Sequence, residues 1–134
     1  MFSRIVSLIV VLMFSIGCVA SLPIKRVANE DLTDLKGKWE GFRNTSGAEN
    51  HSNLKTTMDI KNDNVPIEAR IYFHQTTSGV IEYGVLLDVV DGKLVSRSYN
   101  LVFSLFREGN RLQLKGPMTL PRNYHEELTF SKSK

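Results

Sequence analysis

The sequence predicts an all-β protein, an antiparallel meander of about eight strands that closes into an up-and-down barrel behind a short N-terminal helical turn. After Gly37, apolar residues alternate with polar ones at period two, and no stretch of eleven residues repeats at helical spacing. Turn-forming residues interrupt this alternation at short intervals, which leaves no room for the helices of βαβ crossovers. Eight such strands can close on themselves and remove both exposed edges. A β-sandwich is the alternative.

Length and composition limit the chain to one ordinary folded domain, expected over residues 35–134. The chain has 134 residues, of which 42% are hydrophobic and 23% charged, as in soluble globular proteins. Removing Arg4 with the N-terminal segment lowers the formal net charge from +3 to +2. This small, evenly interspersed charge argues against a nucleic-acid partner.

Residues 1–20 have the pattern of an export signal. Arg4 gives a positive start, residues 5–14 are apolar except for Ser7, and small residues follow. The apolar run is shorter than the roughly 20 residues that a spanning helix needs. We therefore expect an exported protein, either secreted or held in the periplasm or cell envelope.

Two cleavage rules compete at the end of this segment. Small residues at Cys18 and Ala20 allow cleavage before Ser21, whereas residues 15–18 (Ser-Ile-Gly-Cys) resemble a bacterial lipobox. Cys18 is the only cysteine, which favours cleavage before it and lipidation as the sole attachment to a membrane. The mature domain then has no disulfide. The sequons at Asn44 and Asn50 are interpreted as chance matches in a polar stretch.

Residues 21–34 are predicted to form a tether and a short helical turn. Asn29 can cap this turn, Glu30 and Asp31 lie at its start, and Gly37 can end it. The first strand is expected over 38–43, and a loop rich in Asn, Ser and Gly over 44–53.

The remaining strands follow from alternation between turn signals. Asp91-Gly92 is the strongest hairpin signal, because glycine tolerates the positive φ of a type I′ turn. Pro117 and Pro121 bracket a predicted loop. Residues 94–106 are long enough for one bent strand or two. The other expected strands cover residues 54–60, 68–74, 81–87, 111–116 and 124–131.

The segment 35–41 (LKGKWEG) carries a resemblance to a known family. A helical turn, then Gly-x-Trp on the first strand, then a meander, resembles the calycins, the family of lipocalins and avidin-like barrels. The resemblance implies that Trp39 closes one end of the barrel. It also implies a basic side chain from a late strand over the indole, for which Arg111 or Lys115 is the candidate.

Catalytic and metal-binding patterns are weak. His51, His74 and His125 share no short metal-ligand spacing, so no metal or cofactor is expected. The best acid/base grouping is Glu68, Arg70, Tyr72 and His74, which alternation places on one strand face. The opposite charges of Glu68 and Arg70 are more simply explained by a solvent-exposed outer face with pairing between strands than by a catalytic site. We therefore expect no catalytic residue; an extracytoplasmic hydrolase or isomerase using this face is the weakest hypothesis.

Aromatic residues at inward positions suggest a binding function instead. Trp39, Tyr83, Tyr99 and Phe103 either complete a solid core or line a cavity for a small apolar or amphipathic ligand. The leading hypothesis is a non-catalytic binding barrel. The alternative is a ligand-free module that contacts or inhibits an envelope protein through loops 44–53 and 116–123.

Overall fold

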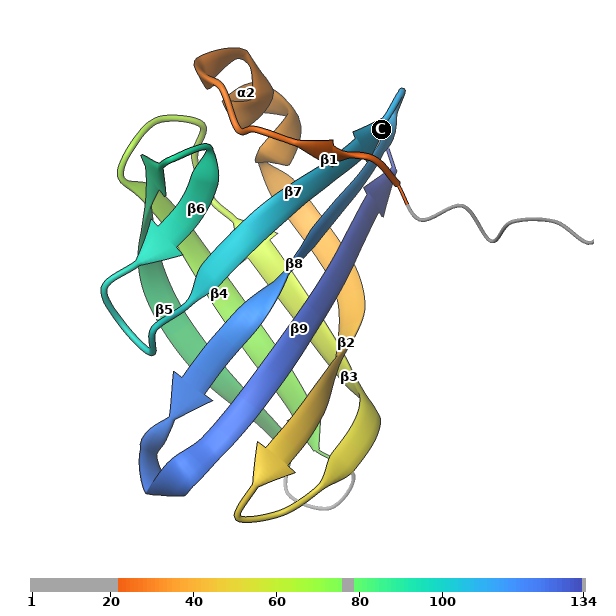
Figure 1. Cartoon of the computed structure of the whole chain (residues 1–134), viewed down its shortest axis with the longest axis vertical. Coiled ribbons are helices and arrows are strands. Elements are labelled where there is room, and N and C mark those ends of the chain that lie inside the picture. The colour runs from red at the N-terminus through yellow and green to blue at the C-terminus, as the bar shows by residue number, and fades with distance from the viewer. Residues whose placement is uncertain (1–21, 76–78, 134) are drawn as a thin grey trace, which may run out of the picture.

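The computed structural model describes residues 22–75 and 79–133, so the expected export signal and Cys18 lie outside the described residues. Figure 1 shows a β-barrel with a short helical segment at one end. None of the helices in the described part is long and apolar enough to cross a membrane. The elements are β1 (Ile24–Lys25), η1 (Asn29–Asp31), α2 (Leu32–Leu35), β2 (Gly37–Gly47), β3 (His51–Ile60), β4 (Ile67–Gln75), β5 (Gly79–Val90), β6 (Lys93–Ser96), β7 (Val102–Glu108), β8 (Arg111–Leu120), η2 (Pro121–Asn123) and β9 (Tyr124–Ser133).

Strands β2 to β9 form a closed antiparallel barrel, as the alternation predicted. Each strand pairs with the next along the chain, and β9 pairs back onto β2. Trp39 lies opposite Met58 on β3, and Arg43 lies opposite Leu128 on β9. Asp91 and Gly92 have φ values of 52° and 73°, and form the two-residue turn between Val90 and Lys93. Closure through β2 and β9 excludes the β-sandwich.

The N-terminal segment is part of the barrel wall. On one edge of β7, β6 pairs with Val102 and Phe103, and β1 pairs further along with Leu105 and Phe106. The N–H of Val27 also donates to the carbonyl of the β5–β6 turn at 2.9 Å. The short strand β1 therefore continues the wall where β6 stops (Figure 1).

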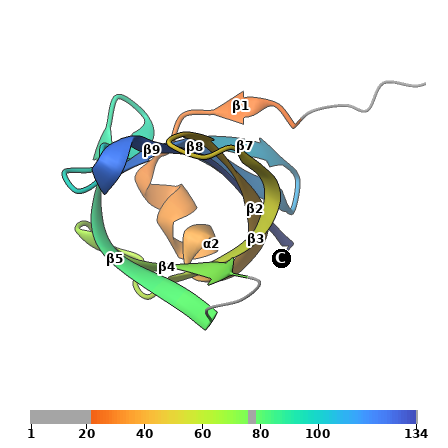
Figure 2. The ribbon, with the colours of Figure 1, turned by 90° about the horizontal axis from the view of Figure 1, so that it is seen from below.

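The helical segment closes one end of the barrel. Figure 2, which looks along the barrel from the opposite end, shows α2 lying across it. Leu32 and Leu35 are buried, and the Trp39 indole N–H donates to the Leu35 carbonyl at 2.8 Å. Trp39 has no exposed surface, as its position at this end predicted.

Large apolar side chains fill the barrel from this closed end to its middle. They come from every strand of the barrel, so the interior forms one continuous core. Its largest fully buried members are Trp39, Phe73, Phe103, Phe130, Leu35, Met58, Ile60, Ile67, Ile71, Leu87, Leu94 and Leu101.

Glycines allow the strands to curve tightly. A Cβ at Gly41 would lie 1.7 Å from the Thr129 carbonyl oxygen, and one at Gly116 would lie 1.6 Å from that of Val102. Only a residue without a side chain permits such a close approach of two backbones.

The prediction that residues 44–53 and 116–123 form loops is largely wrong. β2 runs on to Gly47, β3 begins at His51, and β8 continues through Pro117 to Leu120. Polar residues can occupy these strand ends because they lie near solvent at the open end of the barrel. Pro117 is tolerated because β7 pairs only with 111–115 of β8, which leaves an edge where a missing N–H costs little.

Candidate binding site at the open end of the barrel

The end of the barrel opposite α2 holds a hollow of about 710 Å³, which we call the cup. This volume lies within the range of small-molecule sites, roughly 300–1,000 Å³. The cup is formed by the ends of β2, β3, β4, β5, β8 and β9. Its apolar wall consists of Leu54, Phe73, Ile81, Tyr83, Leu120 and Tyr124, and its rim includes Glu49, His51, Gln75 and Arg122.

A buried polar triad of Arg43, Thr45 and Glu126 also lines the cup. The Arg43 Nη1 group donates to Glu126 Oε1 and to Thr45 Oγ1, both at 3.0 Å. The Thr45 hydroxyl donates to Glu126 Oε2 at 2.7 Å. The side chains of Arg43 and Glu126 are only 7% and 2% exposed, so this ion pair is almost fully shielded from solvent. Both carboxylate oxygens of Glu126 accept a hydrogen bond within the triad.

The register of β2 on β9 brings the triad together. Arg43 and Thr45 follow Trp39 at even spacing on β2, and therefore point to the same face of the strand. Thr45 lies directly opposite Glu126 on β9. Alternation from Trp39 marks both β2 residues as inward, so the sequence carried a signal for them that our prediction missed.

Arg43 retains unused hydrogen-bond donors. Its Nε lies buried without a partner. The Nη2 group has no hydrogen bond to any residue that the structure describes, but it is not fully buried and remains accessible to water. A guanidinium has five N–H groups, and the triad uses the two on Nη1. A buried donor without a partner, such as this Nε, is uncommon because it gives up its hydration without compensation.

Aromatic rings support the guanidinium and the inner wall of the cup. Arg43 Cζ lies 4.1 Å from the centroid of the Phe73 ring, a cation–π contact. The centroids of Phe73 and Tyr83 are 4.9 Å apart, and those of Tyr83 and Tyr99 are 5.3 Å apart. Burial of Tyr83 raises the pKa of its phenol, and the neighbouring Tyr99 adds to this effect.

The four predicted lining residues are divided between the core and the cup. Trp39 and Phe103 have no exposed surface and belong to the core. Tyr83 lines the cup, while Tyr99 is half-buried behind it. The Tyr99 carbonyl accepts a hydrogen bond from the N–H of Thr119 on β8 at 2.7 Å, and the Tyr99 ring contacts Tyr83 on β5. The turn between β6 and β7 therefore contacts both β5 and β8.

The grouping of Glu68, Arg70, Tyr72 and His74 lies on the outer face of β4, as alternation predicted. Arg70 pairs with Glu82 at 2.8 Å, and both side chains are 46% exposed. Glu68 and Arg70 also border a second, outer hollow of about 820 Å³ against β5 and residues 96–98. The cup is the stronger candidate, because its Arg43–Glu126 pair is buried whereas the ion pair beside the outer hollow is open to solvent.

At the closed end, the basic side chain over Trp39 is Lys132 of β9. Its Nζ lies 5.8 Å from the indole and donates to the Asp34 carbonyl at 2.8 Å and to the Lys36 carbonyl. The candidates Arg111 and Lys115 were wrong. Strand pairing explains this, because β9 lies next to β2, the strand of Trp39, whereas β8 does not.

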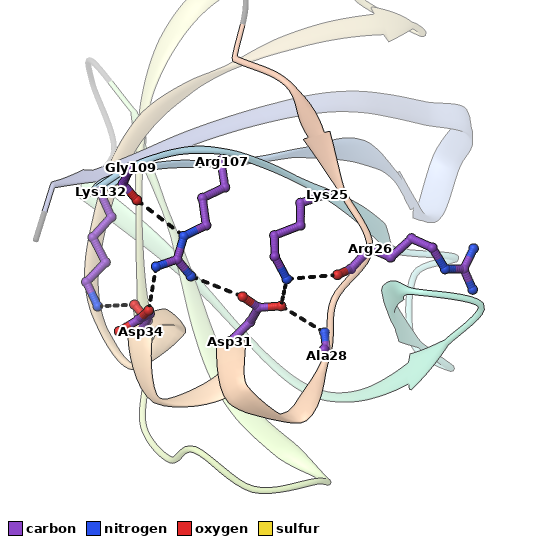
Figure 3. A network of polar contacts seen from close by, with 8 residues as sticks. All are labelled: Lys25, Arg26, Ala28, Asp31, Asp34, Arg107, Gly109 and Lys132. Atoms are coloured by element: carbon purple, nitrogen blue, oxygen red, sulfur yellow. Dashed lines mark hydrogen bonds and ion pairs between the residues drawn. The ribbon is translucent and has the colours of Figure 1, made fainter.

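Carboxylates of the helical segment join it to the barrel wall (Figure 3). Arg107 donates to Asp31 at 3.0 Å and to Asp34 at 2.9 Å, and Asp31 also accepts from Lys25 and from the N–H of Ala28. Burial opposes ionisation of Asp31, but these hydrogen bonds and the charges of Lys25 and Arg107 outweigh it and lower its pKa below 3.8.

Over residues 22–75 and 79–133, no group of three or more His, Cys, Asp or Glu side chains could hold a metal ion. Comparisons of the chain with models of protein families, with curated proteins and with solved structures find no match.

Proposed function

We propose that this chain is an exported, non-catalytic binding protein that holds a small amphipathic ligand in the cup. The observation that carries the proposal is the buried Arg43, which borders a concave site of mixed apolar and polar lining and keeps donors there without a partner among the described residues. An apolar wall with a few fixed polar groups is typical of ligand sites. The Gly-x-Trp segment and the Lys132 contact with Trp39 add to the resemblance to calycins.

Binding of Nile red, an uncharged fluorescent dye, tests the proposal. Emission should rise and shift to the blue when the dye enters the cup. Leu54→Trp, which enlarges a side chain of the cup wall, should weaken binding by at least about tenfold. Leu86→Trp is the matched control, because Leu86 is 58% exposed and borders only the outer hollow. An unchanged Leu54→Trp variant, or equal loss in both variants, would contradict the proposal.

Native mass spectrometry of the protein extracted from its own host in mild detergent tests the same proposal with the natural ligand. We expect an adduct that is lost on denaturation, and its mass identifies the ligand. A ligand-free mass would favour an interaction module instead. The exposed apolar side chains Val80, Leu86 and Val90 on β5 support that second candidate.

The same spectrum tests the proposed lipid anchor. A mature chain that begins at Cys18 and carries acyl groups is the expected result, and Cys18→Ala should release the protein from membranes. A chain that begins at Ser21, or a Cys18→Ala variant that fractionates like the wild type, would show that export proceeds without lipidation.

A further inference from the structure

We infer that the polar end of the ligand is an uncharged hydrogen-bond acceptor, such as a ketone, ester or amide oxygen, that accepts from Arg43, and that the cup discriminates against anions. This inference rests on the proposed binding function and specifies its ligand class.

The need for an acceptor follows from the unpaired donors. Only Nη1 of Arg43 has partners, while Nε and Nη2 have none among the residues that the structure describes. Phe73 covers one face of the guanidinium at 4.1 Å. A ligand oxygen must therefore approach in the plane of the guanidinium and accept from Nη2, because Nε is fully buried.

The preference for an uncharged group follows from the charge of the triad. Glu126 already compensates Arg43 at 3.0 Å, and the two side chains are at most 7% exposed. An anion bound to Arg43 would add a second negative charge beside Glu126 in a shielded site, where its desolvation is not compensated. At the rim, His51 pairs with Glu49 at 3.0 Å, and Arg122 is exposed. The rim therefore offers an anion no buried cation to replace Arg43.

The part of the ligand that contacts the inner wall is apolar. Beyond the triad, the inner wall consists of Phe73, Tyr83, Leu54, Ile81 and Leu120. Removing apolar surface of the ligand from water against these side chains favours binding. The cup therefore suits a molecule with one uncharged polar group on an aliphatic or aromatic body.

A matched pair of ten-carbon probes, 2-decanone and decanoate, tests the inference by displacement of Nile red at pH 8. Because an ionised acid enters any apolar site less readily than a ketone, the measured quantity is the ratio of the two Kd values in each variant. We expect wild type to favour 2-decanone. Glu126→Gln leaves the positive charge of Arg43 uncompensated. In this variant the affinity for decanoate, relative to that for 2-decanone, should rise by at least about tenfold.

The double variant Arg43→Met/Glu126→Gln removes both charges and tests the acceptor contact. It should lose about tenfold in affinity for 2-decanone, the size of a hydrogen bond to a charged donor. Arg70→Met/Glu82→Gln is the matched control, because this ion pair lies on the outer face of the barrel with both side chains 46% exposed, and it should leave both Kd values unchanged within about twofold. Circular dichroism and Trp39 emission verify the fold of each variant.

Failure of the inference is distinguishable from failure of the proposed function. If decanoate binds wild type more tightly than 2-decanone, or if Glu126→Gln leaves the ratio unchanged, the cup binds ligands but the inference is wrong. If neither Nile red nor either probe binds, both are overturned. Should the variants fail to fold, the ¹H–¹⁵N resonances of the Arg43 guanidinium in wild type decide, because they must shift with 2-decanone at a lower concentration than with decanoate, and an equal or stronger response to decanoate would overturn the inference.

Discussion

Replacing Asp31 with Asn removes the central charge of the network between the helical segment and the wall while keeping the size of the side chain. The Asp31 side chain is 2% exposed and accepts from Lys25 and Arg107, which are 37% and 24% exposed. Both cations can regain water in the variant. The variant should therefore lose less unfolding free energy than the roughly 3–5 kcal/mol that is lost when a fully buried ion pair is broken. The variant loses two charge-assisted hydrogen bonds, each weakened by the partial exposure of its cation. We therefore expect the free energy of unfolding to fall by about 2 kcal/mol at pH 7.

The effect of Asp31→Asn should depend on pH in a defined direction. The pKa of Asp31 in the folded protein is lowered from 3.8, so the folded state binds the proton less readily than the unfolded state does. The stability contributed by this carboxylate is therefore complete above pH 3.8 and is lost as the pH falls through the lowered folded pKa. The difference in unfolding free energy between wild type and variant should shrink below pH 4.

Urea unfolding followed by Trp39 emission, at pH 7 and at steps down to pH 3, measures this difference. Glu82→Gln is the control, because its partner Arg70 lies at a similar 2.8 Å but both side chains are 46% exposed. The control should lower the free energy of unfolding distinctly less than Asp31→Asn does, because water screens an exposed ion pair. A cost for Asp31→Asn as small as that of the control at pH 7, or one that stays constant down to pH 3, would refute the reasoning.

Three further predictions concern the core, the strand curvature and the aromatic wall. Trp39→Phe should destabilise by about 2–3 kcal/mol in urea unfolding, since it leaves a cavity and an unpaired carbonyl on α2. Gly41→Ala should prevent the native fold by circular dichroism, because its Cβ would overlap a carbonyl of β9, whereas Gly84→Ala meets nothing within 4 Å and should fold normally. Absorbance titration of wild type against Tyr83→Phe should show the Tyr83 phenolate forming above pH 10, and ionisation of Tyr83 at or below that pH would contradict its burial beside Tyr99.

Much of the barrel was predictable from local pattern. Period two decides which side chains face inward whatever the partner strand is, so Ile71 and Phe73 are buried and Arg70 is exposed, as predicted. Asp91-Gly92 forms its turn because only a few residues tolerate positive φ at both positions. Trp39 is buried because it stands on the inward face at the start of the first barrel strand.

The binding site depended on pairing between distant strands. Arg43 and Glu126 are 83 residues apart, and only closure of β2 on β9 in one register brings them into contact. The same pairing places Lys132 over Trp39 and excludes Arg111 and Lys115. Alternation specifies a face and carries no information about register or about which strand lies alongside. The sequence by itself thus determined the strands and their inward faces, whereas tertiary closure alone decided which inward polar groups meet and that one end of the barrel stays hollow.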